Sequence, residues 1–169
     1  SSAASDVYKR QGLHSGYPAR ELLPERVVRS ALARASRGET ALTQSPAQGL
    51  PELQAWFASE LAASTPSGVT PVAPRDVFVV PGTQSGLSSV FRSLAGPGHT
   101  VIMESPTYWG AILAAKLAGV RIVPVTSDSG GPDPEDLERA FDESGARVFY
   151  AQPTFANPTG AQWSQERRD

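Results

Sequence analysis

The chain has 169 residues, of which 40% are hydrophobic and 19% are charged, and its formal net charge is -2 at pH 7. This composition supplies the apolar material of one ordinary α/β domain and excludes a chain that is disordered throughout. The absence of cysteine excludes disulfides and thiolate metal sites, and the lack of a long Lys/Arg run argues against nucleic-acid binding through these residues.

The N-terminal part is expected to contain a tail and two helices. Residues 1–11 are small and polar and lack the apolar core of a signal peptide, so we interpret them as a tail or a non-native segment. Pro24 has the position of a helix N1 proline, in a helix that stops at Gly38. A second helix is predicted over residues 50–64. The apolar residues that recur there at helical spacing predict a buried stripe, and they are Leu50, Leu53, Phe57 and Leu61.

From residue 75 the pattern changes to strands that alternate with helices. The expected strands are residues 76–80, 100–104, 121–125 and 147–152, and the expected helices are residues 84–94, 108–118 and 134–143. This alternation predicts an α/β fold, a three-layer wound sheet of mostly parallel strands with right-handed crossovers. The strands are nearly continuously apolar, as expected when helices cover both faces of the sheet.

These patterns divide the chain into a tail (1–11), a helical arm segment (12–74) and the first part of an α/β domain (75–169). Ser164 is expected to cap one more helix, which has barely one turn before Asp169. We therefore expect the α/β domain to be incomplete and the chain to be an N-terminal fragment. No segment has the roughly 20 apolar residues of a membrane helix, and we expect no membrane partner and a cytoplasmic location.

Three turns follow predicted strands, at the edge where ligands bind in open α/β sheets. The turn with Gly82, Thr83 and Gln84 offers backbone N–H groups to a phosphate, although an ordinary glycine turn has the same sequence. Tyr108 follows the next strand, where its ring would either stack on a flat ligand or cover the core. Asn157 lies between two prolines, and its amide would bond a ligand oxygen or belong to a common Asn-Pro turn.

Together and in this order, the turns resemble the fold-type I, class I/II aminotransferases that depend on pyridoxal 5'-phosphate (PLP). The likeness extends from about residue 16 to residue 165 and is carried by ALTQSPAQGLPEL, VVPGTQSGL, ESPTYWGA and ANPTG. It is strongest to the branch that contains the kynurenine/α-aminoadipate aminotransferases and the aminotransferase-like domains of GntR-type regulators. The fold implied is the large domain of the PLP-dependent transferases.

The resemblance implies PLP as cofactor and a role for each matching residue. Gly82, Thr83 and Gln84 would hold the phosphate, and Tyr108 would stack on the pyridine ring. Asn157 would donate a hydrogen bond to the 3' oxygen of the ring. Gly16 and Tyr17 match the segment that closes over the substrate carboxylate. No metal is implied.

The resemblance also implies an amino-group transfer between an amino acid and a 2-oxo acid, by a homodimer in which residues 39–49 contribute across the interface. A tyrosine commonly stands in this branch at the position of Gln44. The Schiff-base lysine of the family lies beyond the point that corresponds to Asp169. The lysines present are Lys9, in the tail, and Lys116, well along a predicted helix, so we expect this chain alone to be inactive.

Two other functions remain open on the sequence alone. The same fold could serve as the PLP-binding effector domain of a GntR-type transcription regulator with a DNA-binding module upstream, and nothing in these residues separates the two. The string D-S-G-G-P at residues 128–132 also occurs in chymotrypsin-like serine proteases, and would make Ser129 a nucleophile with His14 or His99 as its base. The strand–helix alternation and the lack of cysteine favour a plain loop there instead.

Overall fold

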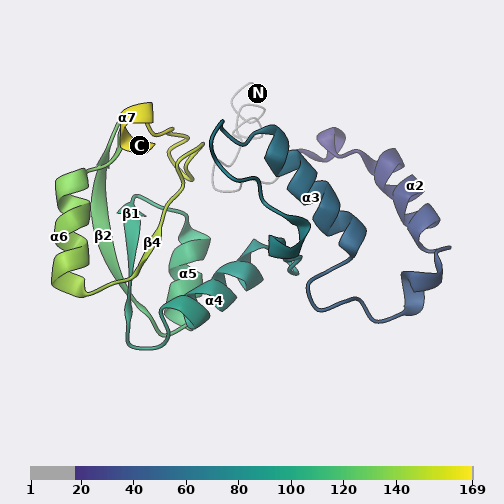
Figure 1. Ribbon diagram of the computed structural model, residues 1–169, viewed down its shortest axis with the longest axis horizontal. Coiled ribbons are helices and arrows are strands. Elements are labelled where there is room, and N and C mark those ends of the chain that lie inside the picture. The colour runs from purple at the N-terminus through teal and green to yellow at the C-terminus, as the bar shows by residue number, and fades with distance from the viewer. Residues whose placement is uncertain (1–17, 169) are drawn as a thin grey trace, which may run out of the picture. The chain divides into compact units, whose positions relative to one another are not determined.

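A computed structural model describes residues 18–168, and they divide into two units between Ala47 and Gln48 (Figure 1). The first unit contains the helix α2 (Glu25–Ala35) and two short 3-10 segments, Arg20–Leu22 and Glu39–Leu42. Pro24 is the N-cap of α2 and not its first helical residue, and its carbonyl accepts a hydrogen bond from the N–H of Val28 at 3.0 Å. The predicted helix is therefore confirmed, one residue shorter at its start and ending before Gly38.

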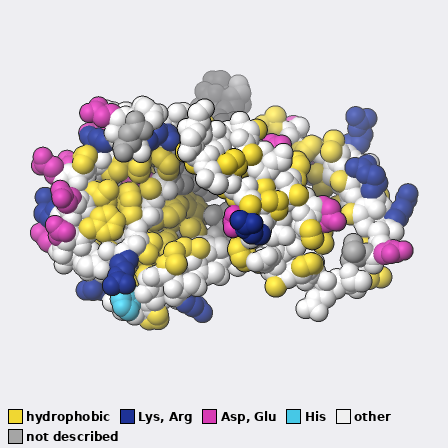
Figure 2. Space-filling view, viewed as in Figure 1, with side chains coloured by type: hydrophobic (Ala, Val, Ile, Leu, Met, Phe, Trp, Pro, Cys, Tyr) yellow, Lys and Arg dark blue, Asp and Glu magenta, His cyan; other side chains and the backbone are white. Residues whose placement is uncertain are grey.

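The second unit begins with α3 (Pro51–Ala63), whose buried face differs from the predicted one. Leu50, Leu53, Phe57 and Leu61 are all exposed, and hydrophobic side chains are visible on the surface over this helix (Figure 2). Gln54 and Ala58, one turn apart, are buried instead. The Gln54 side chain donates to the carbonyl of Val77 at 2.5 Å, so the helix turns a polar residue toward the segment on which it packs. The predicted buried stripe is wrong.

The strand predicted over residues 76–80 is also absent. Residues Pro74–Asp76 form a 3-10 turn, and the chain from Val77 to Val80 is extended without belonging to the sheet. The N–H of Val79 in this segment donates to the carbonyl of Gln48 at 2.9 Å, and Gln48 lies in a loop. A strand forms only where a neighbouring strand supplies a ladder of hydrogen bonds, and none of the described strands does so for this apolar segment.

The remaining elements confirm the α/β fold with its mostly parallel sheet. They are α4 (Thr83–Leu94), β1 (Thr100–Ser105), α5 (Trp109–Leu117), β2 (Arg121–Asp128), β3 (Gly131–Pro132), α6 (Pro134–Ser144), β4 (Val148–Tyr150) and α7 (Gln165–Arg168). The strand order is β3-β2-β1-β4. β1 pairs in parallel with β2 and with β4, and only the short β3 runs antiparallel, next to β2.

Helices cover both faces of this sheet, as the apolar strands predicted. Val101 and Met103 point to one face, where they pack with Phe91 of α4 and with the alanines of α5. Ile102 points to the other face and packs with Ala140 of α6 and Val125 of β2. Figure 1 shows the same three layers, with α6 on one side of the strands and α4 and α5 on the other. β1 is the central strand of the layer that carries the site described below.

Local sequence signals explain where the helices of this unit begin and end. The Asp133 carboxylate caps α6 by accepting from the N–H groups of Glu135 at 2.9 Å and Asp136 at 3.2 Å. Gly145 closes the same helix in the left-handed conformation, with φ of 62°. Ser164 accepts at its Oγ from the N–H of Arg167 at 3.3 Å, which confirms it as the start of α7. Within residues 18–168, no helix is long and apolar enough to cross a membrane.

Candidate functional site

Parallel pairing brings the ends of β1 and β4 to one edge of the sheet. Met103 is in register with Tyr150, so the loop that follows Ser105 and the loop that follows Tyr150 leave from neighbouring positions. The carboxyl edge of a parallel sheet is the side on which ligands bind in open α/β folds. Tyr108 lies on the first of these loops and Asn157 on the second.

The start of α4 provides an open, uncapped helix N-terminus. Gly82 is the N-cap with φ of 103°, and no side chain caps the helix there. A Cβ placed on Gly82 would meet no atom within 4 Å, so the space in front of the first turn is free. The first N–H groups of a helix have no partner within the helix and carry a partial positive charge. Gly82 and the exposed Thr83 therefore form a cradle that suits an anion.

A hydrogen bond from Gln84 ties this cradle to Tyr108. The Gln84 side-chain amide donates to the carbonyl of Gly110 at 2.9 Å. Tyr108 is the N-cap of α5, and its ring lies so close to Gly110 that a Cβ there would overlap with Tyr108 Cζ. The predicted residues 82–84 and Tyr108 are thus brought together. Because the Gln84 side chain is engaged with Gly110, its backbone N–H is the group left to face a ligand.

Asn157 is exposed on the loop after β4 and is held there through its backbone. Its N–H donates to the Oε1 atom of Gln152 at 3.2 Å. The N–H of Gln152 in turn donates to Glu104 near the end of β1, at 2.7 Å. This chain of contacts places the Asn157 loop beside the strand that leads to Tyr108. The other predicted binding residues, Gly16 and Tyr17, lie outside the described residues.

The sequence prediction missed the residue at the centre of this network. Glu104 is 6% exposed, and both of its oxygens are used: Oε2 accepts from the Gln152 N–H and Oε1 accepts from Trp163 Nε1 at 2.8 Å. The Trp163 ring stacks on Phe149, with the centroids 6.3 Å apart and the planes at 21°. The available sequence signal was the acidic residue directly after the apolar run Val101-Ile102-Met103. An acid in a buried strand is kept only when its charge is paired, so Glu104 could have been expected to have hydrogen-bond donors nearby.

Glu104 and Trp163 also line a small cavity of about 150 Å³ at this edge of the sheet, together with residues of the Asn157 loop and of the β2–β3 turn. Tyr150 lies near the same carboxylate. Burial raises the pKa of the Tyr150 phenol, and the nearby Tyr108 and Glu104 raise it further, so the phenol is a neutral donor at pH 7. Within residues 18–168, no group of acidic or histidine side chains is arranged to hold a metal ion.

The structure separates the residues of the serine-hydrolase alternative. Ser129 is exposed in the tight turn between β2 and β3, which is shorter than the loop predicted between residues 125 and 134. His99 lies at the opposite end of β2, because its carbonyl accepts from the N–H of Arg121 at 2.8 Å. The eight residues of β2 span about 25 Å at the rise of a strand. His14 lies outside the described residues.

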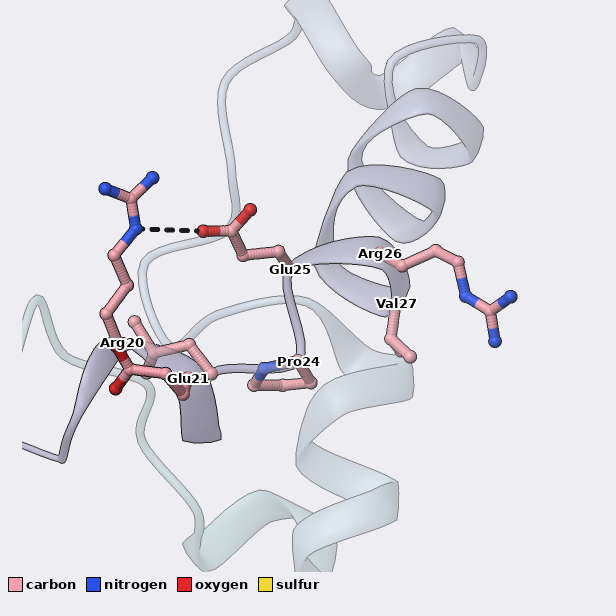
Figure 3. Close-up of a pocket in the computed structure, with 7 residues that line it drawn as sticks. Arg20, Glu21, Pro24, Glu25, Arg26 and Val27 are labelled. Atoms are coloured by element: carbon pink, nitrogen blue, oxygen red, sulfur yellow. Dashed lines mark ion pairs between the residues drawn. The ribbon is translucent and has the colours of Figure 1, made fainter.

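Two further features carry no site. Lys116 is exposed in the last turn of α5, well along the helix as predicted. A hollow of about 630 Å³ lies at the start of α2, where Arg20 and Glu25 form an ion pair at 3.5 Å (Figure 3). All of the residues that line this hollow are exposed, so it is open to solvent and would not enclose a ligand.

The fold is that of a PLP-dependent transferase of fold type I. The profile of the family "Aminotransferase class I and II" matches residues 12–167, and the chain belongs to this family. Its implied cofactor is PLP, and the uncapped start of α4 beside the Tyr108 ring fits a phosphate joined to a flat ring.

Proteins similar to this chain include aminotransferases and a transcriptional regulator. The 2-aminoadipate transaminase of Thermus thermophilus is 36% identical over 86% of this chain and 35% of its own length. The vitamin B6 salvage pathway transcriptional repressor PtsJ of Salmonella typhimurium is 32% identical over 92% of this chain and 34% of its own length. The structure of LysN, an α-aminoadipate aminotransferase from Thermus thermophilus complexed with N-(5'-phosphopyridoxyl)-L-leucine, superposes with a TM-score of 0.79 at 33% identity. That match covers 91% of this chain and 38% of LysN. The chain thus spans about a third of the length of the curated relatives.

Proposed function

We propose that this chain is the cofactor-anchoring part of a PLP-dependent aminotransferase that moves an amino group between an amino acid and a 2-oxo acid. The observation that carries the proposal is the hydrogen bond from Gln84 to Gly110, which fixes an uncapped helix N-terminus next to an aromatic ring. A phosphate site and a stacking surface that are linked in this way suit the phosphate and the ring of one phosphorylated pyridine. The family membership and the aminoadipate transaminase relative support the same reading.

Each residue of the edge then has a definite task. The N–H groups of Thr83 and Gln84 bind the phosphate, where the helix dipole adds to their hydrogen bonds, and Gly82, whose own N–H donates to the Val80 carbonyl at 2.7 Å, shapes the turn in front of them. The Tyr108 ring supports one face of the pyridine and keeps water from it. The Asn157 side-chain amide, exposed on its loop, donates to the 3' oxygen and holds the negative charge there. When bound, PLP supplies an electron sink for the substrate Cα.

The remaining tasks belong to residues that this edge does not provide. Lys116 is the lysine of the described part, and it is exposed in the last turn of α5, at the end of that helix opposite to Tyr108. We propose that the 169-residue chain by itself has no transaminase activity. We further propose that Gly16 and Tyr17 close over the substrate carboxylate, and that the whole protein acts as a cytoplasmic homodimer with residues 39–49 at the interface.

A second function is supported by one of the relatives. PtsJ is named as a transcriptional repressor, and the match to it covers 92% of this chain. In a protein of that kind, the same edge would bind PLP as an effector, and occupancy would bias DNA binding by another part of the protein.

A PLP titration of the whole protein tests the proposal. We expect Tyr108→Ala to weaken PLP binding about two- to tenfold, the equivalent of an aromatic stacking contact of about 0.5–1.5 kcal/mol. The matched control is Trp109→Ala, because Trp109 is the next residue and is 70% exposed. Equal PLP affinity of the two variants, or no PLP binding by the unmodified protein, would contradict the cofactor site. Turnover of an amino acid with a 2-oxo acid then supports the enzyme, and PLP binding without turnover supports the regulator.

A further inference from the structure

The Asn157 loop is anchored to the sheet at two places by a single carboxylate. Glu104 accepts one hydrogen bond from the Gln152 backbone and one from the Trp163 indole, at 2.7 Å and 2.8 Å. These two donors flank Asn157 along the chain, five residues before it and six residues after it. The carboxylate therefore holds both ends of the segment that carries the proposed ligand of the 3' oxygen.

The contacts continue from the carboxylate to Asn157 itself. The Gln152 side chain accepts from the Asn157 N–H at 3.2 Å, while the Gln152 N–H is held by Glu104. At the far end, the N–H of Trp163 donates to the carbonyl of Pro153 at 3.0 Å, which closes the loop on itself. Displacing either donor of Glu104 would therefore displace the Asn157 backbone.

Burial makes this anchor strong and intolerant of a neutral replacement. Glu104 is 6% exposed, and a hydrogen bond to a charged, buried acceptor is stronger than one between neutral groups. A glutamine at this position keeps the shape but has one oxygen in place of two. Its NH₂ group would face either the Gln152 N–H or the Trp163 indole, donor against donor, so one end of the loop would be released.

We infer that Glu104 is a positioning residue, which acts on the cofactor through Asn157 by fixing the loop between Gln152 and Trp163. The inference rests on the proposed function, because it assigns to Glu104 the placement of a PLP ligand. Glu104 is not expected to touch the cofactor. Its effect is expected to disappear when the Asn157 side chain is removed.

The test compares Glu104→Gln, Asn157→Ala and the double variant in the whole protein loaded with PLP. The readouts are the dissociation constant of PLP and the pH at which the absorbance of the bound cofactor changes. A donor to the 3' oxygen favours its ionised form, so losing that donor raises this pH. We expect Glu104→Gln to weaken PLP binding about tenfold or more, as for the loss of one hydrogen bond to a charged group, and to raise the pH of the absorbance change.

The matched control is Asp136→Asn on α6. Asp136 also accepts from one backbone and one side-chain donor of a strand, Thr126 N at 2.8 Å and Thr126 Oγ1 at 2.7 Å, and in addition from Arg139 on its own helix, but no contact joins it to the Asn157 loop. We expect its PLP affinity and absorbance to match those of the unmodified protein. If Glu104→Gln does not fold, Trp163→Phe removes one of the two donors and keeps a ring against Phe149, and a smaller change of the same sign is expected.

In the Asn157→Ala background, Glu104→Gln should add nothing to either readout. An unchanged PLP affinity in Glu104→Gln, or an effect that persists in full without the Asn157 side chain, would overturn the inference and leave the cofactor site intact. If Asn157→Ala itself leaves both readouts unchanged, the proposed role of Asn157 is wrong and the positioning role of Glu104 is overturned with it.

Discussion

Gly131, at the turn between β2 and β3, is the position where one added carbon should do most damage to the loop that carries Asn157. Its φ is 130°, and a Cβ there would lie 3.0 Å from Trp163 Cγ and 3.2 Å from Cδ1. The backbone conformation costs a residue other than glycine about 1–3 kcal/mol. The close approach to a ring that is stacked on Phe149 adds about 1–3 kcal/mol of overpacking. We therefore expect Gly131→Ala to lower the free energy of unfolding by about 4 kcal/mol.

The control is Gly145→Ala, which has the backbone strain without the steric contact. Gly145 has φ of 62° at the end of α6, and a Cβ there would meet no atom within 4 Å. Only the left-handed conformation is penalised, by about 1–2 kcal/mol. Urea unfolding followed by circular dichroism measures both variants, and the difference between them reports the contact with Trp163. Equal losses in the two variants would refute the packing of Trp163 against the β2–β3 turn.

Three further predictions concern the same part of the protein. Ser129→Ala should leave cofactor binding and turnover of the whole protein unchanged, as measured by PLP titration and a transamination assay. A loss of turnover would contradict the interpretation of Ser129 as a plain turn residue. The Gly130 N–H first, and then the Arg167 guanidinium, hold the pKa of Asp128 below its ordinary value of 3.8. The stabilisation that this gives is present above pH 3.8 and is lost as the pH falls through the lower folded pKa, so Asp128→Asn should flatten the acid limb of a stability–pH profile. Because burial raises the pKa of Tyr150 above 10.0, folding is favoured below pH 10 and this contribution is lost as the pH rises, so Tyr150→Phe should lessen the alkaline loss of stability.

Much of the α/β part was predictable because its signals are local. The strands at residues 100–104 and 121–125 are short apolar runs bounded by turns, and Asp133, Gly145 and Ser164 mark helix ends by their own backbone and side-chain chemistry. Each of these features depends on residues within a few positions of one another. They were confirmed with small changes at their ends.

The errors arose where the outcome depends on what packs against a segment. Residues 76–80 have the composition of a strand, yet among the described strands no neighbour pairs with them. The helix α3 has an apolar stripe with the correct period, but the face that is buried contains Gln54, because the Val77 carbonyl lies against it. Periodicity shows that one side of a helix is apolar, and it does not show which side another element covers.

The candidate site was predictable as a set of turns but not as a network. The ends of β1 and β4 led to Tyr108 and Asn157 without any knowledge of contacts, whereas Gly82 was expected after a strand that does not form. Glu104 was missed because its partners are 48 and 59 residues further along the chain. A buried acid can be recognised from its strand, whereas the donors that satisfy it are set by the tertiary fold.

The two ends of the proposed cofactor site depend on one short stretch of chain. The phosphate end is held by the bond from Gln84 to Gly110, and the 3' oxygen end is held through the bonds to Glu104. Glu104 lies near the end of β1 and Gly110 near the start of α5, and β1 is buried on both faces and paired in parallel on both sides. A rigid central strand thus sets the distance between the phosphate cradle and the Asn157 loop. A change at Gly82 or Asn157 should therefore affect one end of the cofactor, whereas a shift of β1 itself should affect both.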